Sequence, residues 1–312
     1  MEILIKKEEL HNYSIGREDL VSLKTMGHIY EICYLQKKNY KVSTQLLDKD
    51  HYFSLETGEI FECNHIVNRS ENKFQVGQSL KRLRDYINTN VVEPNNCKWV
   101  TLTYADNMQD TKKLYNDFKR FMTRFKRRFK EYKIEYIVAM EPQARGAWHC
   151  HCIIIFDGVA PFIPNSTIEK LWQQGFTKTS KLENIDNIGA YLTAYLGDME
   201  LTEENINELK KQCFNLSQMV LKEVNEIEGI KLKEPKSFIK GARLYMYPPK
   251  FNLYRISRGI KKPKKEYFSY HVAKEKAGLR LPTYSKGFTL SDTENSFTNK
   301  IIYEYYNTKR SN

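Results

Sequence analysis

Residues 134–156, IEYIVAMEPQARGAWHCHCIIIF, contain the pattern that decides the fold of this chain. Two runs rich in β-branched and apolar residues, 134–141 and 148–156, flank the short segment PQARGA. Such runs are typical of strands, and a short segment with Pro and Gly between them is typical of a turn. The stretch therefore predicts a β-hairpin, and its second strand is apolar enough to lie in the centre of a sheet.

The second predicted strand carries His149 and His151, separated by one residue. Because side chains alternate across a strand, both imidazoles lie on one face, and Cys150 and Cys152 lie on the other. Glu141 ends the first strand, close enough across a hairpin to add a carboxylate oxygen to the two imidazole nitrogens. We expect these three residues to hold Mg²⁺ or Mn²⁺, although zinc also accepts such ligands. The alternative is a pair of partly buried structural histidines beside a carboxylate that only ends the hairpin.

A strand and a long helix are predicted before the hairpin. KWVTLTY (98–104) has the period-two pattern of a strand, and Asp106 or Asp110 is placed to cap the helix that follows. Apolar residues recur at three- and four-residue spacing down one side of this helix of about twenty residues. This stripe consists of Leu114, Phe118, Phe121, Met122, Phe125 and Phe129.

Further alternation of helix and strand patterns follows the hairpin. A short helix near STIEKLWQQ, a strand-like run FTKTSKL and a helix capped by Asp186 are predicted in this order. The whole order predicts an α+β fold with a central, mostly antiparallel sheet flanked by helices.

Tyr191 and Tyr195 lie four residues apart in NIGAYLTAYLGD (187–198). On a helix, both phenols emerge from one face, with their Cβ atoms about 5–6 Å apart. The small neighbour Gly189 permits close approach to a sheet or to a DNA backbone. Without the histidines, the pair is more typical of an aromatic stripe packed against a core.

Changes of pattern predict three regions. Residues 1–95 mix strand-like runs with a basic helix and form an accessory region, and residues 96–200 form the domain that contains the hairpin. Residues 201–312 are acidic and helical through Glu228 and then basic and aromatic. The strand-like LYRISRGI, within about 250–260, is expected to add an edge strand to the central sheet.

The charge balance favours a polyanionic partner. Fifty Lys and Arg against 38 Asp and Glu give a formal net charge of +12, which suits nucleic acid or an acidic membrane surface. The 21 Tyr and 16 Phe favour single-stranded nucleic acid, since bases stack on rings while cations follow phosphates; the alternative is that these rings form the core. The candidate DNA-binding cations are Arg124, Arg127, Arg128, Arg145, Arg255, Arg258, Lys261 and Lys262.

The sequence also limits the cellular setting. No stretch approaches the roughly 18 apolar residues of a membrane span, and the start MEILIKKEEL lacks the apolar core of a secretory signal. We therefore expect a cytoplasmic protein without a membrane partner, whose cysteines are reduced. A metal cluster of Cys63 and His65 with Cys33, His51 or Cys97 is an alternative, but its spacing fits no tight zinc template.

Together, the motifs resemble the rolling-circle replication initiators of the HUH endonuclease superfamily, named for its His, hydrophobic residue, His motif. Three motifs match in the family's order: VTLTY (100–104), GAWHCH (146–151) with Glu141 upstream, and YLTAY (191–195). The later SRGIKKP (257–263) also resembles segments of phage and plasmid replication proteins from Gram-positive hosts.

The resemblance implies a ferredoxin-like or RRM-like palm with N- and C-terminal extensions, and a site-specific DNA endonuclease and strand-joining activity. It implies that Tyr191 or Tyr195 attacks single-stranded origin DNA and forms a 5′-phosphotyrosine. It also implies that a divalent cation held by His149, His151 and Glu141 assists this attack. A host helicase and polymerase are the partners that such an initiator would need.

One departure concerns the tyrosine motif. Many two-tyrosine initiators have Lys three positions after each tyrosine, whereas this chain has Ala194 and Asp198. The order of attack by the two tyrosines is therefore left open. Tyrosines that follow the histidines argue against a mobilisation relaxase, and two tyrosines argue against a single-strand transposase. A non-catalytic nucleic-acid-binding module is the alternative from a different class.

Overall fold

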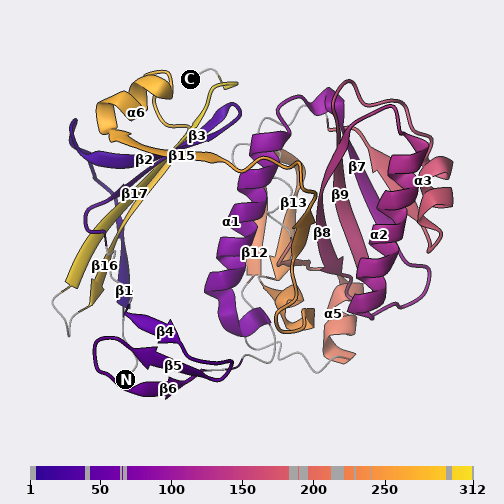
Figure 1. The fold of residues 1–312 in the computed structure, drawn as a ribbon, viewed down its shortest axis with the longest axis horizontal. Helices are drawn as coiled ribbons and strands as arrows, with labels where there is room; N and C mark the ends of the chain where they lie inside the picture. Colours follow the sequence, from indigo (N-terminus) through magenta and orange to yellow (C-terminus); the bar gives the residue numbers. More distant parts are fainter. Residues whose placement is uncertain are drawn as a thin grey trace. The chain divides into compact units, whose positions relative to one another are not determined.

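The structure is a computed structural model that describes residues 5–38, 43–63, 65, 69–182, 189, 196–211, 221–227, 230–239, 241–292 and 297–310. The chain divides into two compact units, one formed by residues 1–67 with 264–312 and the other by residues 68–263. Both units contain antiparallel sheets and helices (Figure 1). The predicted α+β class with a mostly antiparallel sheet is confirmed.

A five-stranded antiparallel sheet forms the centre of the unit at residues 68–263, in the order β10-β7-β9-β8-β14. The predicted hairpin is present as β8 and β9, and β9 lies in the middle of the sheet. β14 pairs with β8 at the edge and falls within LYRISRGI. The strands are β7 (Cys97–Thr103), β8 (Ile134–Pro142), β9 (Trp148–Phe156), β10 (Thr177–Ser180) and β14 (Tyr254–Ile256).

The long predicted helix, α2 (Thr111–Arg128), covers one face of this sheet together with α3 (Asn165–Trp172) (Figure 1). It begins at Asp110, whose carboxylate accepts two backbone N–H hydrogen bonds of the first turn. The predicted apolar stripe is buried against alternate strand residues such as Cys150 and Cys152. Each large apolar side chain buried in this way stabilises the fold by about 1.5–3 kcal/mol.

The opposite face of the sheet is covered by α1 (Lys73–Asn90) (Figure 1). Leu83 and Ile87 of this helix pack with Ile137 and Ile153 of the central strands. Since side chains alternate along β9, the residues between its α2-facing cysteines point toward α1. This alternation places His149 and His151 on the α1 face.

Shorter elements complete this unit. Three 3-10 turns, at Arg69–Asn72, Pro94–Asn96 and Ala242–Met246 (η1, η2 and η4), accompany α5 (Glu203–Lys211) and the small sheet β11-β13-β12. The strands of this small sheet are β11 (Met199–Glu200), β12 (Leu221–Ile227) and β13 (Ile230–Ile239).

The predicted helix through Glu228 is wrong for residues 221–227, which form β12. Their sequence, LKEVNEI, alternates apolar and polar residues over VNEI and pairs with β13 in an antiparallel hairpin. Glutamate-rich composition favours a helix locally, whereas the neighbouring strand supplies backbone hydrogen bonds that override this preference.

The unit formed by residues 1–67 and 264–312 contains a six-stranded antiparallel sheet in the order β1-β16-β17-β3-β2-β15. The helix α6 (Tyr270–Lys276) packs on one face of it. The strands are β1 (Ile5–Leu10), β2 (Leu20–Met26), β3 (Ile29–Leu35), β15 (Lys264–Ser269), β16 (Tyr284–Asp292) and β17 (Phe297–Asn307). A separate small sheet consists of β4 (Thr44–Leu46), β5 (His51–Ser54) and β6 (Ile60–Glu62).

The two units group the chain differently from the three predicted regions. α1 comes from the predicted accessory region 1–95 but packs on the sheet that contains the histidines. Residues 264–312 share a sheet with the N-terminal strands, because β15 pairs with β2 and β17 pairs with β3. Among the described residues, no helix has the length and apolar character needed to cross a membrane.

Candidate metal centre

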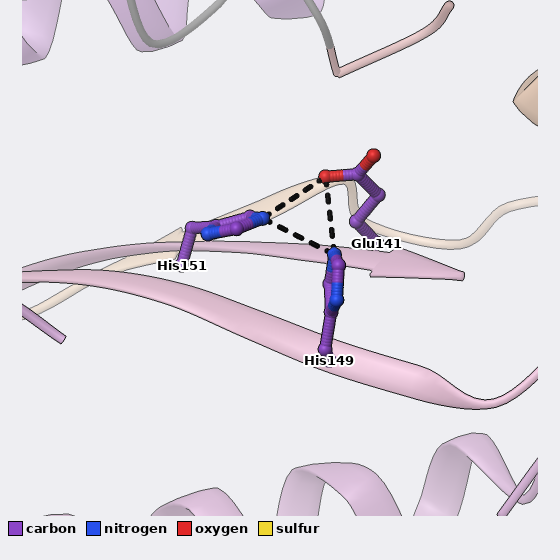
Figure 2. A group of neighbouring side chains, drawn as sticks. All are labelled: Glu141, His149 and His151. Carbon is purple, nitrogen blue, oxygen red and sulfur yellow. Dashed lines mark hydrogen bonds and ion pairs between the residues drawn. The ribbon is translucent and has the colours of Figure 1, made fainter. Parts of the chain in front are cut away.

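Glu141, His149 and His151 meet on the α1 face of the β8–β9 hairpin. The strand register pairs Glu141 directly with His149, and His151 lies two residues further along the same strand face. Figure 2 shows the three side chains pointing toward one another. The Oε2 atom of Glu141 lies 3.3 Å from Nε2 of His149 and 3.2 Å from Nε2 of His151. The two Nε2 atoms are 3.1 Å apart, so the predicted ligands form one cluster.

The spacing of these atoms fits a small divalent cation. Two ligands that each lie about 2.1 Å from an ion and at right angles to one another are about 3.0 Å apart. One carboxylate oxygen and two imidazole nitrogens also leave coordination positions for water or substrate. Within the described residues, this cluster is the group of three potential ligands whose ligand atoms come together.

The alternative cluster of cysteines and histidines is not formed in the described part of the chain. His51 contacts the carboxylate of Asp48, and His65 contacts that of Asp50, at 3.0 and 2.8 Å. These exposed pairs explain both histidines without a metal ion.

Arg243 balances the charge of the buried Glu141 carboxylate. Its Nη1 atom lies 2.7 Å from Oε1 of Glu141, the oxygen that does not contact the histidines. Burial raises the pKa of Glu141, but Arg243 and the hydrogen bonds with His149 and His151 outweigh burial and hold this pKa well below its usual range. Glu141 is therefore ionised at neutral pH, which is the form that binds a cation.

His149 is held in the neutral form. Burial lowers the pKa of its imidazole, and the neighbouring Glu141 carboxylate offsets this effect only in part. A neutral imidazole keeps the nitrogen lone pair that a metal ligand needs.

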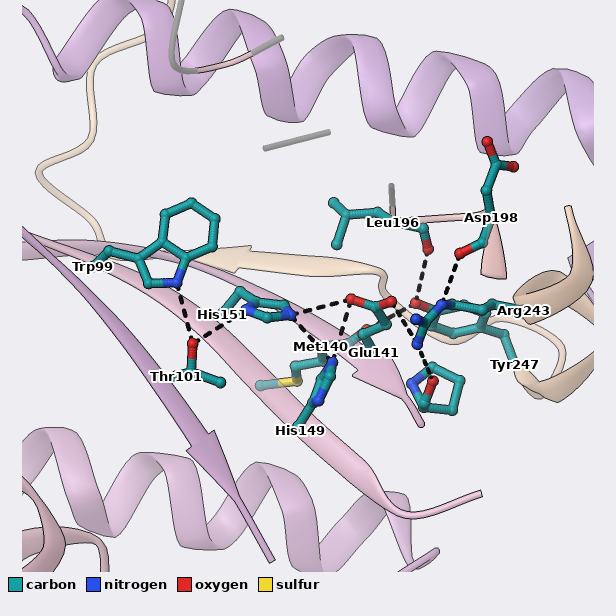
Figure 3. Close-up of polar contacts among 11 residues, drawn as sticks. Trp99, Thr101, Met140, Glu141, His149, His151, Leu196, Asp198, Arg243 and Tyr247 are labelled. Carbon is teal, nitrogen blue, oxygen red and sulfur yellow. Dashed lines mark hydrogen bonds and ion pairs between the residues drawn. The ribbon is translucent and has the colours of Figure 1, made fainter. Parts of the chain in front are cut away.

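The guanidinium of Arg243 also binds two backbone carbonyl groups (Figure 3). Its Nη1 donates to the carbonyl of Pro142 and its Nε to the carbonyl of Asp198, each at 2.8 Å. The Asp198 side chain accepts a hydrogen bond from the backbone N–H of Gly241, also at 2.8 Å. Arg243 thereby fastens the end of β8 to the segment that directly follows the YLTAY motif.

Tyr247 links the same two segments. Its hydroxyl oxygen lies 3.1 Å from the carbonyl oxygen of Met140 and 3.5 Å from that of Leu196 (Figure 3). The side chain is 1% exposed, and burial raises its pKa well above the usual range. Tyr247 therefore serves as a structural link and is unsuited to act as a nucleophile.

Thr101 orients the outer histidine. Its Oγ1 atom lies 3.5 Å from Nδ1 of His151 and accepts a hydrogen bond from the indole N–H of Trp99 at 3.2 Å (Figure 3). A histidine that offers Nε2 to a cation carries its proton on Nδ1, which then needs an acceptor. The hydroxyl oxygen of Thr101 supplies that acceptor.

A hollow opens beside His151, between α1 and the sheet. Its lining is largely apolar and includes Leu196, the residue that directly follows YLTAY in the sequence. The lining residues are Leu83, Ile87, Trp99, Ile137, Ala139, His151, Ile153 and Leu196.

Tyr191 and Tyr195 lie outside the described residues, as does the predicted helix cap Asp186. Their catalytic role is therefore a prediction from the sequence and its resemblance. The described residues that flank them, Gly189 and Leu196, are both buried.

The candidate DNA-binding cations of α2 lie away from the cluster. Arg124, Arg127 and Arg128 belong to the helix that covers the face opposite the histidines, and Arg124 donates to the Gln173 side chain at 2.6 Å. Arg255 of β14 lies 3.5 Å from the ring centroid of Tyr115 on that same helix. The structure does not bring these four arginines together with the histidines.

The remaining candidate cations lie in loops. Arg145 belongs to the β8–β9 turn, and its Nη2 donates to the carbonyl of Tyr104 at 3.1 Å. Arg258, Lys261 and Lys262 follow β14, where the backbone N–H of Lys261 donates to the Asn90 side chain at the end of α1. DNA contacts of all eight cations stay predictions.

Sequence reasoning missed Arg243, Tyr247 and Thr101. The period-two pattern of VTLTY could have indicated Thr101, because its strand pairs it directly with His151. No local pattern distinguishes Arg243 from the other cations of its basic and aromatic segment.

A comparison with protein families supports a role in replication. Residues 97–200 match the family model of the replication-associated proteins of the ORF2 type. The match begins at the first residue of β7 and includes the hairpin, all three cluster residues and the YLTAY motif. No curated protein and no solved structure has significant similarity to the chain. Residues 97–200 are therefore assigned to this family of replication-associated proteins, consistent with a rolling-circle replication initiator.

Proposed function

We propose that this chain nicks single-stranded DNA at a replication origin, with Tyr191 or Tyr195 as the nucleophile and with Glu141, His149 and His151 as the ligands of Mg²⁺ or Mn²⁺. The observation that carries the proposal is the convergence of an ionised carboxylate and two imidazoles with donor atoms 3.1–3.3 Å apart. The family match adds support for action on replicating DNA.

A bound divalent cation would supply positive charge that polarises the scissile phosphate. The tyrosine oxygen gives up its proton, forms a bond to phosphorus and displaces the 3′ oxygen, which takes up a proton and becomes a 3′-hydroxyl. The phosphate ester is conserved in the 5′-phosphotyrosine, so a later attack by a 3′-hydroxyl rejoins strands without ATP. The freed 3′-hydroxyl is the primer that a host polymerase would extend after a helicase opens the duplex.

The chain around the tyrosine motif supports this assignment. Leu196, which directly follows Tyr195 in the sequence, lines the hollow beside His151. Two residues further on, the carbonyl of Asp198 accepts the hydrogen bond from Arg243 that is described above. The peptide that leaves the motif is therefore held at the proposed metal site.

The test is a cleavage assay with single-stranded candidate origin DNA. With Mn²⁺ or Mg²⁺, we expect a covalent protein–DNA adduct that survives a denaturing gel, and with EDTA we expect none. Equal adduct in EDTA would remove the metal ion from the proposal. Salt-sensitive DNA binding without any adduct would support the non-catalytic module instead.

Arg243→Ala is expected to weaken Mn²⁺ binding by about 10–100-fold, because the arginine positions a ligand without touching the ion. The change also leaves the buried Glu141 carboxylate without its cationic partner, at a cost to stability of about 3–5 kcal/mol. Calorimetric titration with Mn²⁺ measures the first effect and thermal unfolding measures the second.

Arg145→Ala is the matched control, because Arg145 lies in the adjacent turn and its guanidinium binds Gln143 and the Tyr104 carbonyl instead of Glu141. It should leave Mn²⁺ affinity unchanged. Arg243→Lys keeps the charge but loses the second hydrogen-bonding branch, and should give an intermediate affinity. A folded Arg243→Ala protein with wild-type Mn²⁺ affinity would contradict the positioning role.

A further inference from the structure

A second surface suited to nucleic acid lies on the six-stranded sheet, outside the residues of the family match. Strand alternation places Tyr284 and Phe288 of β16 on the same face as Tyr303 and Tyr305 of β17. Neighbouring rings follow one another at centroid distances of 5.9, 6.5 and 6.2 Å, from Tyr284 through Tyr305 and Tyr303 to Phe288. We call this surface the aromatic face and define it by Tyr267, Tyr284, Phe288, Phe297, Tyr303 and Tyr305.

Lysine side chains accompany these rings. Lys7 lies over Phe288, Lys286 over Tyr303 and Lys37 over Phe297, with Nζ-to-centroid distances of 4.3, 5.7 and 5.4 Å. Lys38 and Lys265 both lie over Tyr267, at 5.0 and 5.5 Å. The five contacts hold positive charge directly above the ring surfaces.

The two faces of the sheet differ in how far their rings are covered. On the α6 face, Tyr306 is 1% exposed and belongs to the buried core. On the aromatic face, Tyr267 and Tyr284 are 55% and 56% exposed, and Phe297 is 41% exposed. Burial against α6 explains the first set of rings but leaves the second set unexplained.

We infer that the aromatic face binds single-stranded nucleic acid, with bases stacked on its rings and its lysines near the phosphates. Exposed rings with interleaved cations fit this ligand, because each base offers a π-face and each nucleotide a negative charge. Duplex DNA fits poorly, since its bases are already stacked on each other. The inference goes beyond the proposed function because it requires neither the metal cluster nor strand cleavage.

Charge complementarity also selects this occupant. The exposed charged side chains of the face include Lys7, Lys265 and Lys286, while Glu9 opposite Phe288 is an exposed carboxylate among them. The other carboxylate on this face, Glu31, is buried in an ion pair with Lys24 at 3.1 Å. The exposed lysines outnumber the exposed carboxylate and favour a polyanion.

The test measures binding of a fluorescein-labelled oligothymidylate of about twenty nucleotides to the full chain by fluorescence anisotropy. EDTA is present throughout, so that no metal-dependent cleavage contributes. Tyr284→Leu should weaken binding by about tenfold, because it keeps an apolar side chain but removes the ring. Tyr284→Phe keeps the ring and should bind within about twofold of wild type.

Charge reversals on the two faces form a matched pair. Lys286→Glu should weaken binding several-fold more than Lys276→Glu, which makes the same change of net charge on the exposed end of α6. A labelled duplex should bind the wild-type chain and Tyr284→Leu equally. Thermal unfolding checks that the variants are folded, and Tyr267→Leu replaces Tyr284→Leu if the latter is unstable.

Two results would overturn the inference: wild-type oligothymidylate affinity in folded Tyr284→Leu and Tyr267→Leu, or equal losses from Lys286→Glu and Lys276→Glu. The second result would reduce the effect to net charge alone. Because cleavage is absent from the assay, a failed nicking experiment leaves this outcome unaffected.

Discussion

Replacing Tyr191 and Tyr195 together with phenylalanine is expected to abolish the covalent adduct between the protein and origin DNA. Phenylalanine keeps the ring but lacks the oxygen that forms the bond to phosphorus, so no 5′-phosphotyrosine can form. Tyr247, which lies beside the cluster, cannot replace the lost nucleophile, since its hydroxyl is buried against the Met140 carbonyl. DNA affinity should change little, because phosphate contacts dominate it.

The measurement uses labelled single-stranded origin DNA with Mn²⁺ and separates adduct from free DNA on a denaturing gel. Tyr245→Phe is the matched control, because Tyr245 is 48% exposed and lies outside the YLTAY motif. The two single variants decide the order of attack, which the missing lysines leave open. Adduct in the folded double variant would remove both tyrosines from the mechanism.

The second large effect is expected from His149→Ala. This change removes one of the two imidazole nitrogens of the cluster and should lower the rate of adduct formation by about a thousandfold, since cation charge on the phosphate is worth several kcal/mol. Mn²⁺ affinity measured by calorimetry should fall in parallel. Affinity for single-stranded DNA in EDTA should stay close to wild type, because the histidine contributes no charge to phosphate binding.

His65→Ala provides the control for removal of a histidine. His65 is exposed and pairs with Asp50, so its loss should alter neither Mn²⁺ affinity nor cleavage. Wild-type cleavage by folded His149→Ala protein would show that the cluster is structural. Loss of cleavage with unchanged Mn²⁺ affinity would place the ion elsewhere.

The arrangement of Arg243 explains how a buried carboxylate and two imidazoles coexist without a counter-ion from solvent. Three of its contacts, to Glu141, Pro142 and Asp198, measure 2.7–2.8 Å. A planar guanidinium presents several donors in fixed directions, which a lysine ammonium does not. Arg243 therefore couples the ionisation of one metal ligand to the position of the chain that follows the tyrosine motif.

The sequence by itself determined the hairpin, the capped helix α2 and the metal cluster. These features rest on local rules: apolar residues alternate with a period of two in strands, recur with a period near 3.6 in helices, and Asp110 precedes the first helical turn. A two-residue separation on a strand places His149 and His151 on one face whatever surrounds them. The paired position of Glu141 follows from the short turn that joins the same two strands.

Only the tertiary structure decided which distant segments complete these local features. α1 covers the histidine face, α2 and its arginines cover the opposite face, and Arg243 comes from the far side of the tyrosine motif to bind Glu141. β12 became a strand because β13 lies beside it, and the aromatic face exists because β17 pairs with β3 and β16. Local composition is blind to such contacts, since their hydrogen bonds and buried surfaces form between residues that are remote in sequence and whose pairing the folded chain alone selects.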